Sequence, residues 1–169
     1  MMISMLLGAA MQVASVSLPA GDQDITWGMS VAQVKNLQEV HKAGKGSQYN
    51  YADHMETDPE VYVRRADDNK KIEYYFFKGK LYKIYIVYDR KVSTQDFYLK
   101  LIDKAQEQYG NAQSNYQENV MGIPVLHVKW DDGESIMDLR SGAGYVYKVL
   151  IDKSAQKEKA LQQQRKRSI

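Results

Sequence analysis

The stretch KIEYYFFKGKLYKIYIVYD, residues 71–89, decides the fold of this chain. Two runs of aromatic and β-branched residues flank Lys78-Gly79, and glycine readily supplies the positive φ that a two-residue turn needs. The pattern predicts a β-hairpin. Both of its faces are largely apolar, and its predicted register places Tyr74 and Tyr85 on the same face. We therefore expect this hairpin to be central in its sheet and covered on both sides.

A second hairpin is predicted in VLHVKWDDGESIMDLR, residues 125–140, around a turn at Asp132-Gly133. Its alternation gives one apolar core face, formed by Leu126, Val128, Trp130, Met137 and Leu139. The opposite face carries His127, Lys129, Asp138 and Arg140. This register puts His127 directly across from Asp138, whose carboxylate would favour the protonated imidazole and make a weak pH-sensitive contact. The alternative is an exposed ladder pair of little consequence.

One helix is predicted before each hairpin. The first follows a capping-box pattern at Ser30 and Gln33, and its apolar residues recur at helical spacing, at Val31, Val34, Leu37 and Val40. The second is expected to begin at an N-cap, Ser93, and to end at Gly110.

Further strands are predicted at Glu60–Arg65, Tyr116–Val120 and Tyr145–Asp152. The order is thus helix, three strands, helix, and three or four strands. This order predicts an α+β fold, with one antiparallel sheet of about six to seven strands and the helices packed on one face. Because a helix precedes each group of strands, a duplicated helix-plus-meander unit is an open alternative.

Composition divides the 169 residues into three segments. Residues 1–20, MMISMLLGAAMQVASVSLPA, have no charged side chain and contain an apolar run as long as a signal-peptide core, although no Lys or Arg precedes it. Cleavage after Ser15 or Ala20 would leave small residues at the cut; a retained membrane anchor and a buried first helix are the alternatives. Residues 21–152 fit one domain, and 153–169 form a basic helical or disordered tail.

Charge and cysteine content exclude several classes of protein. The net charge is +2, but residues 153–169 hold six basic residues and one acid, which leaves the rest at about −3 and unsuited to nucleic-acid binding. Within the tail, Arg165-Lys166-Arg167 is a candidate site for anionic lipid, nucleic acid or an acidic partner, or simply a solubilising terminus. With no cysteine there is no disulfide, thiolate zinc site, cysteine nucleophile or lipid-bearing cysteine.

No sequence motif for catalysis or cofactor binding occurs. The three histidines, at 41, 54 and 127, form no paired-ligand motif, and there is no phosphate-cradling or serine-nucleophile motif. Acidic residues gather instead at expected turns, at Asp67-Asp68, at Asp131-Asp132 and within 53–60, where they would point outward. We therefore assign no catalytic, metal or cofactor-binding residue. A hydrolase that uses turn carboxylates is the least favoured function.

Tyrosine is unusually frequent, with 13 residues against 3 Phe and 2 Trp. Its apolar ring and polar tip suit binding surfaces, although tyrosine also simply favours strands. We therefore predict a binding surface for a protein or peptide on one sheet face, with candidate residues Tyr74, Tyr85, His127, Lys129 and Asp138. The alternative is a structural protein, or a homodimer, whose aromatic faces are wholly internal.

The segment ITWGMSVAQVKNL, residues 25–37, resembles the Gly-Met-Ser/Thr-x-x-x-Val opening of small bacterial envelope proteins of the BamE type. Those proteins have a helical N-terminal part followed by antiparallel strands, and the related β-lactamase-inhibitor-protein architecture doubles such a unit and binds proteins on its sheet. The resemblance implies an exported, protein-binding envelope domain, periplasmic or secreted. It implies no lipid anchor here, since the chain has no cysteine.

Overall fold

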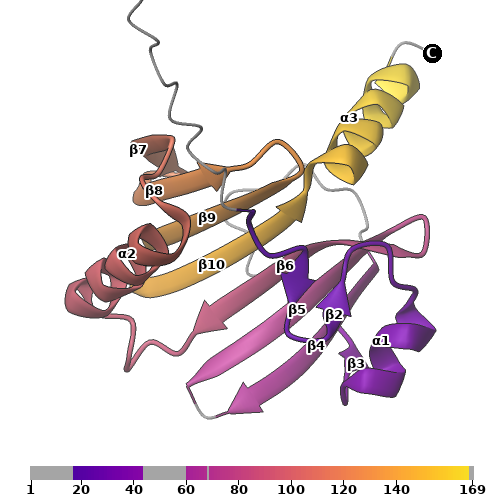
Figure 1. The fold of residues 1–169 in the computed structure, drawn as a ribbon, viewed down its shortest axis with the longest axis horizontal. Helices are drawn as coiled ribbons and strands as arrows, with labels where there is room; N and C mark the ends of the chain where they lie inside the picture. The colour runs from indigo at the N-terminus through magenta and orange to yellow at the C-terminus, as the bar shows by residue number, and fades with distance from the viewer. Residues whose placement is uncertain (1–16, 44–59, 68, 168–169) are drawn as a thin grey trace, which may run out of the picture.

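A computed structural model describes residues 17–43, 60–67 and 69–167 of the chain (Figure 1). Most of the predicted leader and the acidic residues at 53–58 therefore lie outside the described residues. In chain order the elements are β1 (Gly21–Asp22), β2 (Ile25–Thr26), α1 (Val31–Leu37), β3 (His41–Lys42), β4 (Glu60–Asp67), β5 (Lys70–Phe77), β6 (Lys80–Tyr88), α2 (Gln95–Tyr109), β7 (Ser114–Val120), β8 (Ile123–Asp131), β9 (Ser135–Gly142), β10 (Tyr145–Asp152) and α3 (Lys153–Arg167).

The α+β class and the antiparallel sheet are as predicted. The main sheet has eight strands in the order β3-β4-β5-β6-β10-β9-β8-β7, and β1 and β2 pair separately. The predicted number of six to seven strands was too low because β3 has only two residues. Two residues are too few to show a period-2 alternation.

Two meanders meet in the middle of this sheet. α1 precedes β3–β6, α2 precedes β7–β10, and the last strand of each meander pairs antiparallel with the other, β6 against β10. We call residues 31–88 the N-terminal half and residues 95–152 the C-terminal half. Both halves have the same order of one helix and four strands, and each ends the sheet with its first strand.

Helices α1 and α2 begin at side-chain caps. In α1 the Ser30 hydroxyl accepts from the Gln33 N–H, and the Gln33 side chain accepts from the Ser30 N–H, which confirms the predicted capping box. The N-cap of α2 is Thr94 and not Ser93. Ser93 instead donates to the Asp89 carbonyl and accepts from the Val146 N–H, so its hydroxyl joins the start of α2 to β10.

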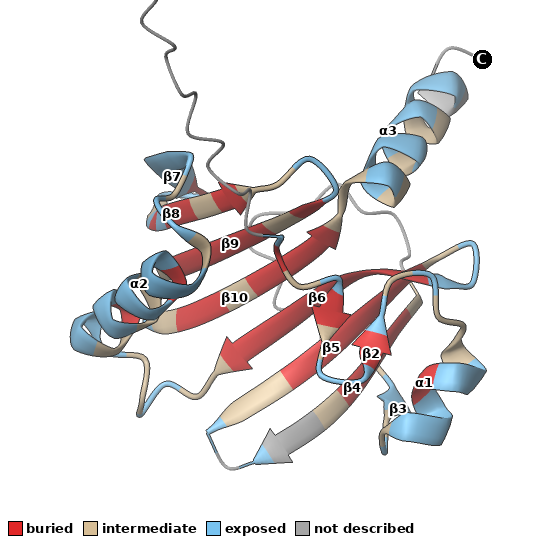
Figure 2. Ribbon diagram, in the orientation of Figure 1, coloured by how far each residue is buried: buried red, intermediate tan, exposed pale blue. Residues whose placement is uncertain are grey.

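α1 and α2 lie on the same side of the sheet, which we call the first face (Figures 1 and 2). Their buried residues Val34, Tyr98 and Ala105 pack into one apolar cluster with first-face residues from both halves, among them Ile72, Tyr74, Ile84, Trp130, Leu139 and Leu150. The Tyr98 hydroxyl donates to the Leu139 carbonyl. Burial, with a further contribution from the charge of Asp138, raises the pKa of Tyr98 to about 12, so this donor stays protonated.

The opposite side of the sheet, the second face, is also buried and more polar. Its apolar cluster consists of Val61, Val63, Tyr75, Tyr82, Tyr85, Val87, Tyr147, Val149 and Ile151. Charged side chains are buried beside this cluster, namely Glu73, Lys83, Asp138 and Arg140, together with His127. The Lys83 ammonium lies 4.6 Å from the centre of the Tyr75 ring and 5.5 Å from that of Tyr85, which compensates part of its desolvation.

The predicted turn at Lys78-Gly79 is confirmed, with positive φ at both residues. The predicted faces of this hairpin are wrong beyond Tyr82. A register shift lets Phe76 face Leu81 while Tyr75 faces Lys83, so Tyr82 is the extra residue of a bulge. As a result, Leu81, Ile84 and Ile86 all join the first-face core, and Tyr85 moves to the second face.

Helix α3 leaves the sheet at the end of β10 and projects away from it (Figure 1). Near its start the Lys153 ammonium pairs with Asp131 at 2.8 Å, and the Lys159 ammonium donates to the Tyr82 hydroxyl at 2.8 Å. These contacts hold only its first turns. In the part of the chain that the structure describes, no helix is both long and apolar enough to cross a membrane.

Candidate functional site at the β7 edge

Strand β7 forms one edge of the eight-stranded sheet and pairs with β8 alone. All seven of its residues pair with β8 in unbroken register, from Ser114 opposite Lys129 to Val120 opposite Ile123. Every side chain of β7 except that of Val120 is exposed. The strand is therefore a regular, open edge that a further strand can extend.

The turn between β7 and β8 determines which backbone groups of β7 face outward. Met121 and Gly122 both have positive φ, at 52° and 83°, as in the two-residue turns that join twisted strands. In such a hairpin the residues that flank the turn exchange hydrogen bonds, and bonded pairs then alternate along the ladder. Ser114, Tyr116, Glu118 and Val120 therefore bond to β8, and the N–H and C=O groups of Asn115, Gln117 and Asn119 point outward.

Exposed apolar side chains border this edge. Tyr116 is 39% exposed, Leu126 43% and Met121 80%, and together they make up half of the large hydrophobic side chains that are exposed in the described residues, the others being Leu37, Leu99 and Leu161. Tyr116 lies on the second face and Leu126 on the first, so exposed apolar side chains border the open edge on both faces, as is typical of interaction surfaces.

A buried charge cluster supports the strand from the second face. Asp138 of β9 is fully buried, and its Oδ2 accepts from Arg140 Nε at 2.7 Å and lies 3.1 Å from His127 Nδ1 and 3.9 Å from the Lys129 ammonium. Arg140 also donates through Nη1 to the Tyr85 hydroxyl at 2.7 Å. Three side chains from β8 and β9 thus converge on one carboxylate, and Tyr85 of β6 joins them through Arg140. This network fixes the end of the sheet next to β7.

His127 connects the charge cluster to the edge strand. Its ring stacks on Tyr116 of β7 with centroids 4.7 Å apart and planes at 2°, and its Nε2 lies 3.5 Å from Glu118 Oε2. The Lys129 ammonium donates to the Tyr116 hydroxyl. β7 is thus held by side chains as well as by its backbone ladder.

The predicted register of this hairpin was wrong by two residues. His127 faces Arg140, and Asp138 faces Lys129, because the loop spans four residues, 132–135, and not two. A shift of two keeps every side chain on its predicted face. His127 therefore still meets Asp138, but diagonally and in a buried position, which is not the exposed ladder pair that we considered as the alternative.

The predicted binding residues divide between the two faces. Tyr85, His127, Lys129 and Asp138 lie together on the second face, whereas Tyr74 is 1% exposed in the core of the first. Tyr85 is 2% exposed, so these tyrosines do not form an aromatic floor that is open to solvent. In the basic tail, Arg165 is exposed near the end of α3, and the side chains of Lys166 and Arg167 lie outside the described residues.

The turn carboxylates at Asp131 and Asp132 hold the β8–β9 loop together. A hydrogen bond from Lys153 is the main cause of the lowered pKa of Asp131. Burial raises the pKa of Asp132, but N–H donors from Ser135, Leu18 and Glu134 outweigh it and lower this pKa overall. Asp67 accepts from the Asn69 N–H at the β4–β5 turn. These carboxylates lie in two separate turns.

Comparison with known proteins yields no relative: no family model matches the chain, and neither a curated protein nor a solved structure does. The residues themselves therefore carry the functional argument. Among the described residues no group of three or more His, Asp or Glu side chains could hold a metal ion.

Sequence reasoning missed the edge residues that matter most. Tyr116–Val120 was predicted as a short strand, but its position at the edge was not predicted. One signal could have indicated it: most side chains of β7 are polar on both faces, as is typical of a strand exposed on both sides, whereas those of the central hairpin are largely apolar. Arg140 was placed on the correct face, but its role as the main partner of Asp138 depends on the register.

Proposed function

We propose that this chain is an exported, non-catalytic binding domain of the bacterial cell envelope that binds an extended segment of protein along β7. One observation carries the proposal: the tyrosine-rich face is buried, whereas β7 offers outward N–H and C=O groups along a regular strand. Strand addition obtains affinity from main-chain hydrogen bonds and specificity from neighbouring side chains. Here Tyr116, Met121 and Leu126 would supply those side-chain contacts.

Two further features support export and an envelope role. The apolar residues 1–20 fit a signal peptide, and residues 25–37 resemble the opening segment of small envelope proteins. The absence of cysteine is compatible with either redox compartment, so it does not decide between them.

A structural role as a dimeric envelope component is the second candidate function. The burial of Tyr74 and Tyr85 favours it, since neither ring is available to a ligand. A hydrolase remains the third and least supported candidate, because the turn carboxylates that it would use serve as hydrogen-bond acceptors within their own loops.

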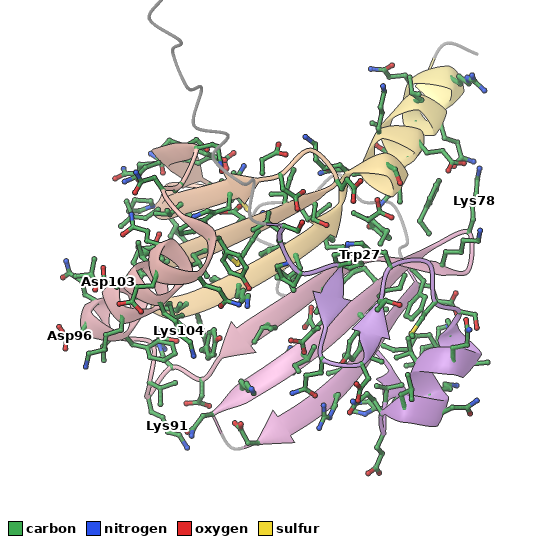
Figure 3. The ribbon with its side chains drawn as sticks, in the orientation of Figure 1. Trp27, Lys78, Lys91, Asp96, Asp103 and Lys104 are labelled. Carbon is green, nitrogen blue, oxygen red and sulfur yellow. The ribbon has the colours of Figure 1, made fainter. Side chains whose placement is uncertain are left out.

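Photo-crosslinking in cells tests the edge directly. A photoreactive amino acid at Gln117 on β7 should form covalent protein adducts, and one at Lys104 should not, because Lys104 is an exposed residue of α2 and not of the strand edge (Figure 3). Gln117→Pro should abolish the adducts of a probe at Asn115. Proline there removes an outward N–H and leaves the ladder to β8 intact.

Gln117→Thr is the matched control for the proline variant, because it keeps the N–H and suits a strand. Adducts that survive Gln117→Pro, or adducts at Lys104 as abundant as those at Gln117, would contradict binding at the β7 edge.

A further inference from the structure

We infer that the strand which binds β7 is β7 of a second copy of this chain, paired antiparallel about a twofold axis at Gln117. The two sheets would then continue into one another across the axis. This inference rests on the proposed binding role of the β7 edge and names its occupant. It follows from the backbone pattern and from the side chains that such pairing brings together.

The backbone pattern of β7 permits this pairing without rearrangement. The groups that point outward belong to Asn115, Gln117 and Asn119, a set that is symmetric about Gln117. Antiparallel pairing about Gln117 puts Gln117 opposite the partner's Gln117, and Asn115 opposite the partner's Asn119. Each of these positions is a hydrogen-bonded pair, so the interface gains about six backbone hydrogen bonds. No hydrogen bond joins these outward groups to another described residue.

The side chains that meet across the axis are complementary on both faces. On the first face Asn115, Gln117 and Asn119 would lie against the same three amides in reverse order, and each amide both donates and accepts. On the second face Tyr116 would lie opposite the partner's Glu118, a hydroxyl donor against a carboxylate acceptor. No two like charges oppose each other, although β7 carries a carboxylate.

β7 also lacks the features that keep a solvent-exposed edge from pairing. Natural edge strands are commonly very short, bulged, or interrupted by lysine or proline. β7 has seven residues in unbroken register with β8 and contains neither lysine nor proline. The other edge of the same sheet, β3, is only two residues long and includes Lys42. Of the two edge strands among the described residues, β7 is therefore the one suited to pairing.

An extended segment of another protein would satisfy the same backbone groups. The side chains favour a second copy, because the amide row and the Tyr116–Glu118 pairing match at each position only when the strand meets itself. A peptide of different sequence would have to supply both features. A charge at residue 117 meets its own copy only when the bound strand is β7 of a second chain. Charged variants at this position therefore distinguish a second copy from a segment of another protein.

A charge-swap experiment on the purified chain tests the twofold. Gln117→Lys places two lysines opposite each other at the axis, and Gln117→Glu places two carboxylates there. Each variant alone should weaken the dimer about five- to tenfold, whereas an equal mixture should form a heterodimer at least as tight as the wild-type dimer. Sedimentation velocity across a range of concentrations measures all four samples. Gln106→Lys, on the exposed side of α2, is the matched control and should dimerise like the wild type.

Hydrogen exchange identifies the interface. The N–H groups of Asn115, Gln117 and Asn119 should gain protection as the concentration rises, while those of Tyr116 and Glu118 are already protected by β8. A wild-type chain that stays monomeric, a Gln117→Lys variant that dimerises unchanged, or a mixture that forms no heterodimer would overturn the inference. A monomer whose crosslinks at Gln117 reach a different protein would overturn only the dimer and leave the binding function standing; a chain with neither dimer nor adduct would overturn both.

Discussion

The two halves of the molecule share one topology and differ at their outer edges. Each half has a helix followed by a four-stranded meander, and they meet at β6 and β10. The N-terminal half ends the sheet with the two-residue strand β3, and the C-terminal half ends it with the seven-residue strand β7. Both halves contribute apolar side chains to the same first-face core. Because this difference lies at the exposed edges of the sheet, it points to interaction and not to folding.

The second face shows a related difference. The third strand of each half, counted from the edge, buries one carboxylate, Glu73 on β5 and Asp138 on β9. Glu73 accepts from the Tyr75 hydroxyl at 2.7 Å and pairs with Lys71, whose side chain is 27% exposed. Asp138 instead pairs with Arg140, whose side chain is 8% exposed. The buried charge pair is thus drier in the half that carries the long edge.

The largest expected effect comes from breaking the charge pair between Asp138 and Arg140. Asp138→Asn leaves the Arg140 guanidinium buried without its carboxylate and should lower the free energy of unfolding by about 3–5 kcal/mol. Glu73→Gln should cost only about 1–2 kcal/mol, since water reaches Lys71 and Tyr75 can still donate to an amide oxygen. Urea unfolding measures both variants.

Asp96→Asn serves as the control for removal of a carboxylate. Asp96 is exposed on α2 and its oxygen lies 3.6 Å from the Lys100 ammonium, so the change should stay within about 0.5 kcal/mol of the wild type. Equal losses for Asp138→Asn and Glu73→Gln would show that the two halves bury their charges equivalently, against our interpretation.

An intermediate effect concerns the segment before β1, which ties both halves together. Leu18 is 7% exposed in the first-face core, and its N–H donates to Asp132 Oδ2 at 2.7 Å in the C-terminal half. A chain that begins at Gly21 should therefore be less stable than one that begins at Val16, by about 2–4 kcal/mol. We accordingly expect export to cleave the leader after Ser15 and not after Ala20.

The mass of the protein recovered from the periplasm measures the cleavage position. A mature chain that begins at Gly21 would contradict this expectation, and an intact Met1 would contradict export itself. Leu18→Ala in the longer chain separates the buried side chain from the backbone hydrogen bond, because it removes the former and keeps the latter.

Local pattern was sufficient to predict most of the elements from the sequence. Apolar alternation and glycine turns located β5, β6, β8, β9 and β10, and cap residues located both helices of the first face. These features depend on residues that are near neighbours in the chain. Register depends on something else: how many residues the turn or bulge absorbs.

Two errors show how register decides what a face carries. The Tyr82 bulge is a shift of one residue on a single strand. It moved both Tyr85 and Val87 from their predicted face, that of Tyr74, to the opposite face. The longer loop at 132–135 is a shift of two residues, and it left all faces correct. The bulge lets Leu81, Ile84 and Ile86 enter the same core, although strict alternation would put Leu81 on the face opposite Ile84 and Ile86. The alternation of the sequence alone does not show such a bulge.

The candidate site was only half predictable for the same reason. His127, Lys129 and Asp138 were placed together because they alternate on two adjacent strands. That β7 lies at the edge depends on β6 pairing with β10, a contact between residues about sixty positions apart in the chain that no local pattern specifies.

The smallest expected effect concerns β6 and β10, where the two halves meet. On the first face Ile86 of β6 lies opposite Lys148 of β10, so one half contributes an apolar side chain and the other an ammonium. Burial lowers the pKa of Lys148, and the positive charges of Lys104 and Lys70 add to this, partly offset by Asp22.

Because the folded state disfavours the charged form, the cost of burying Lys148 is fully present below its folded pKa. It is relieved as the pH rises toward the ordinary value near 10.4. Lys148→Met should therefore raise the free energy of unfolding by about 1 kcal/mol at pH 7. This gain should shrink toward pH 10.5, as measured by urea unfolding at the two pH values. Lys91→Met, at an exposed turn, should show no such trend. A gain independent of pH would mean that the shape of the Lys148 side chain, and not its charge, causes the difference. The contact between β6 and β10 would then carry no electrostatic cost.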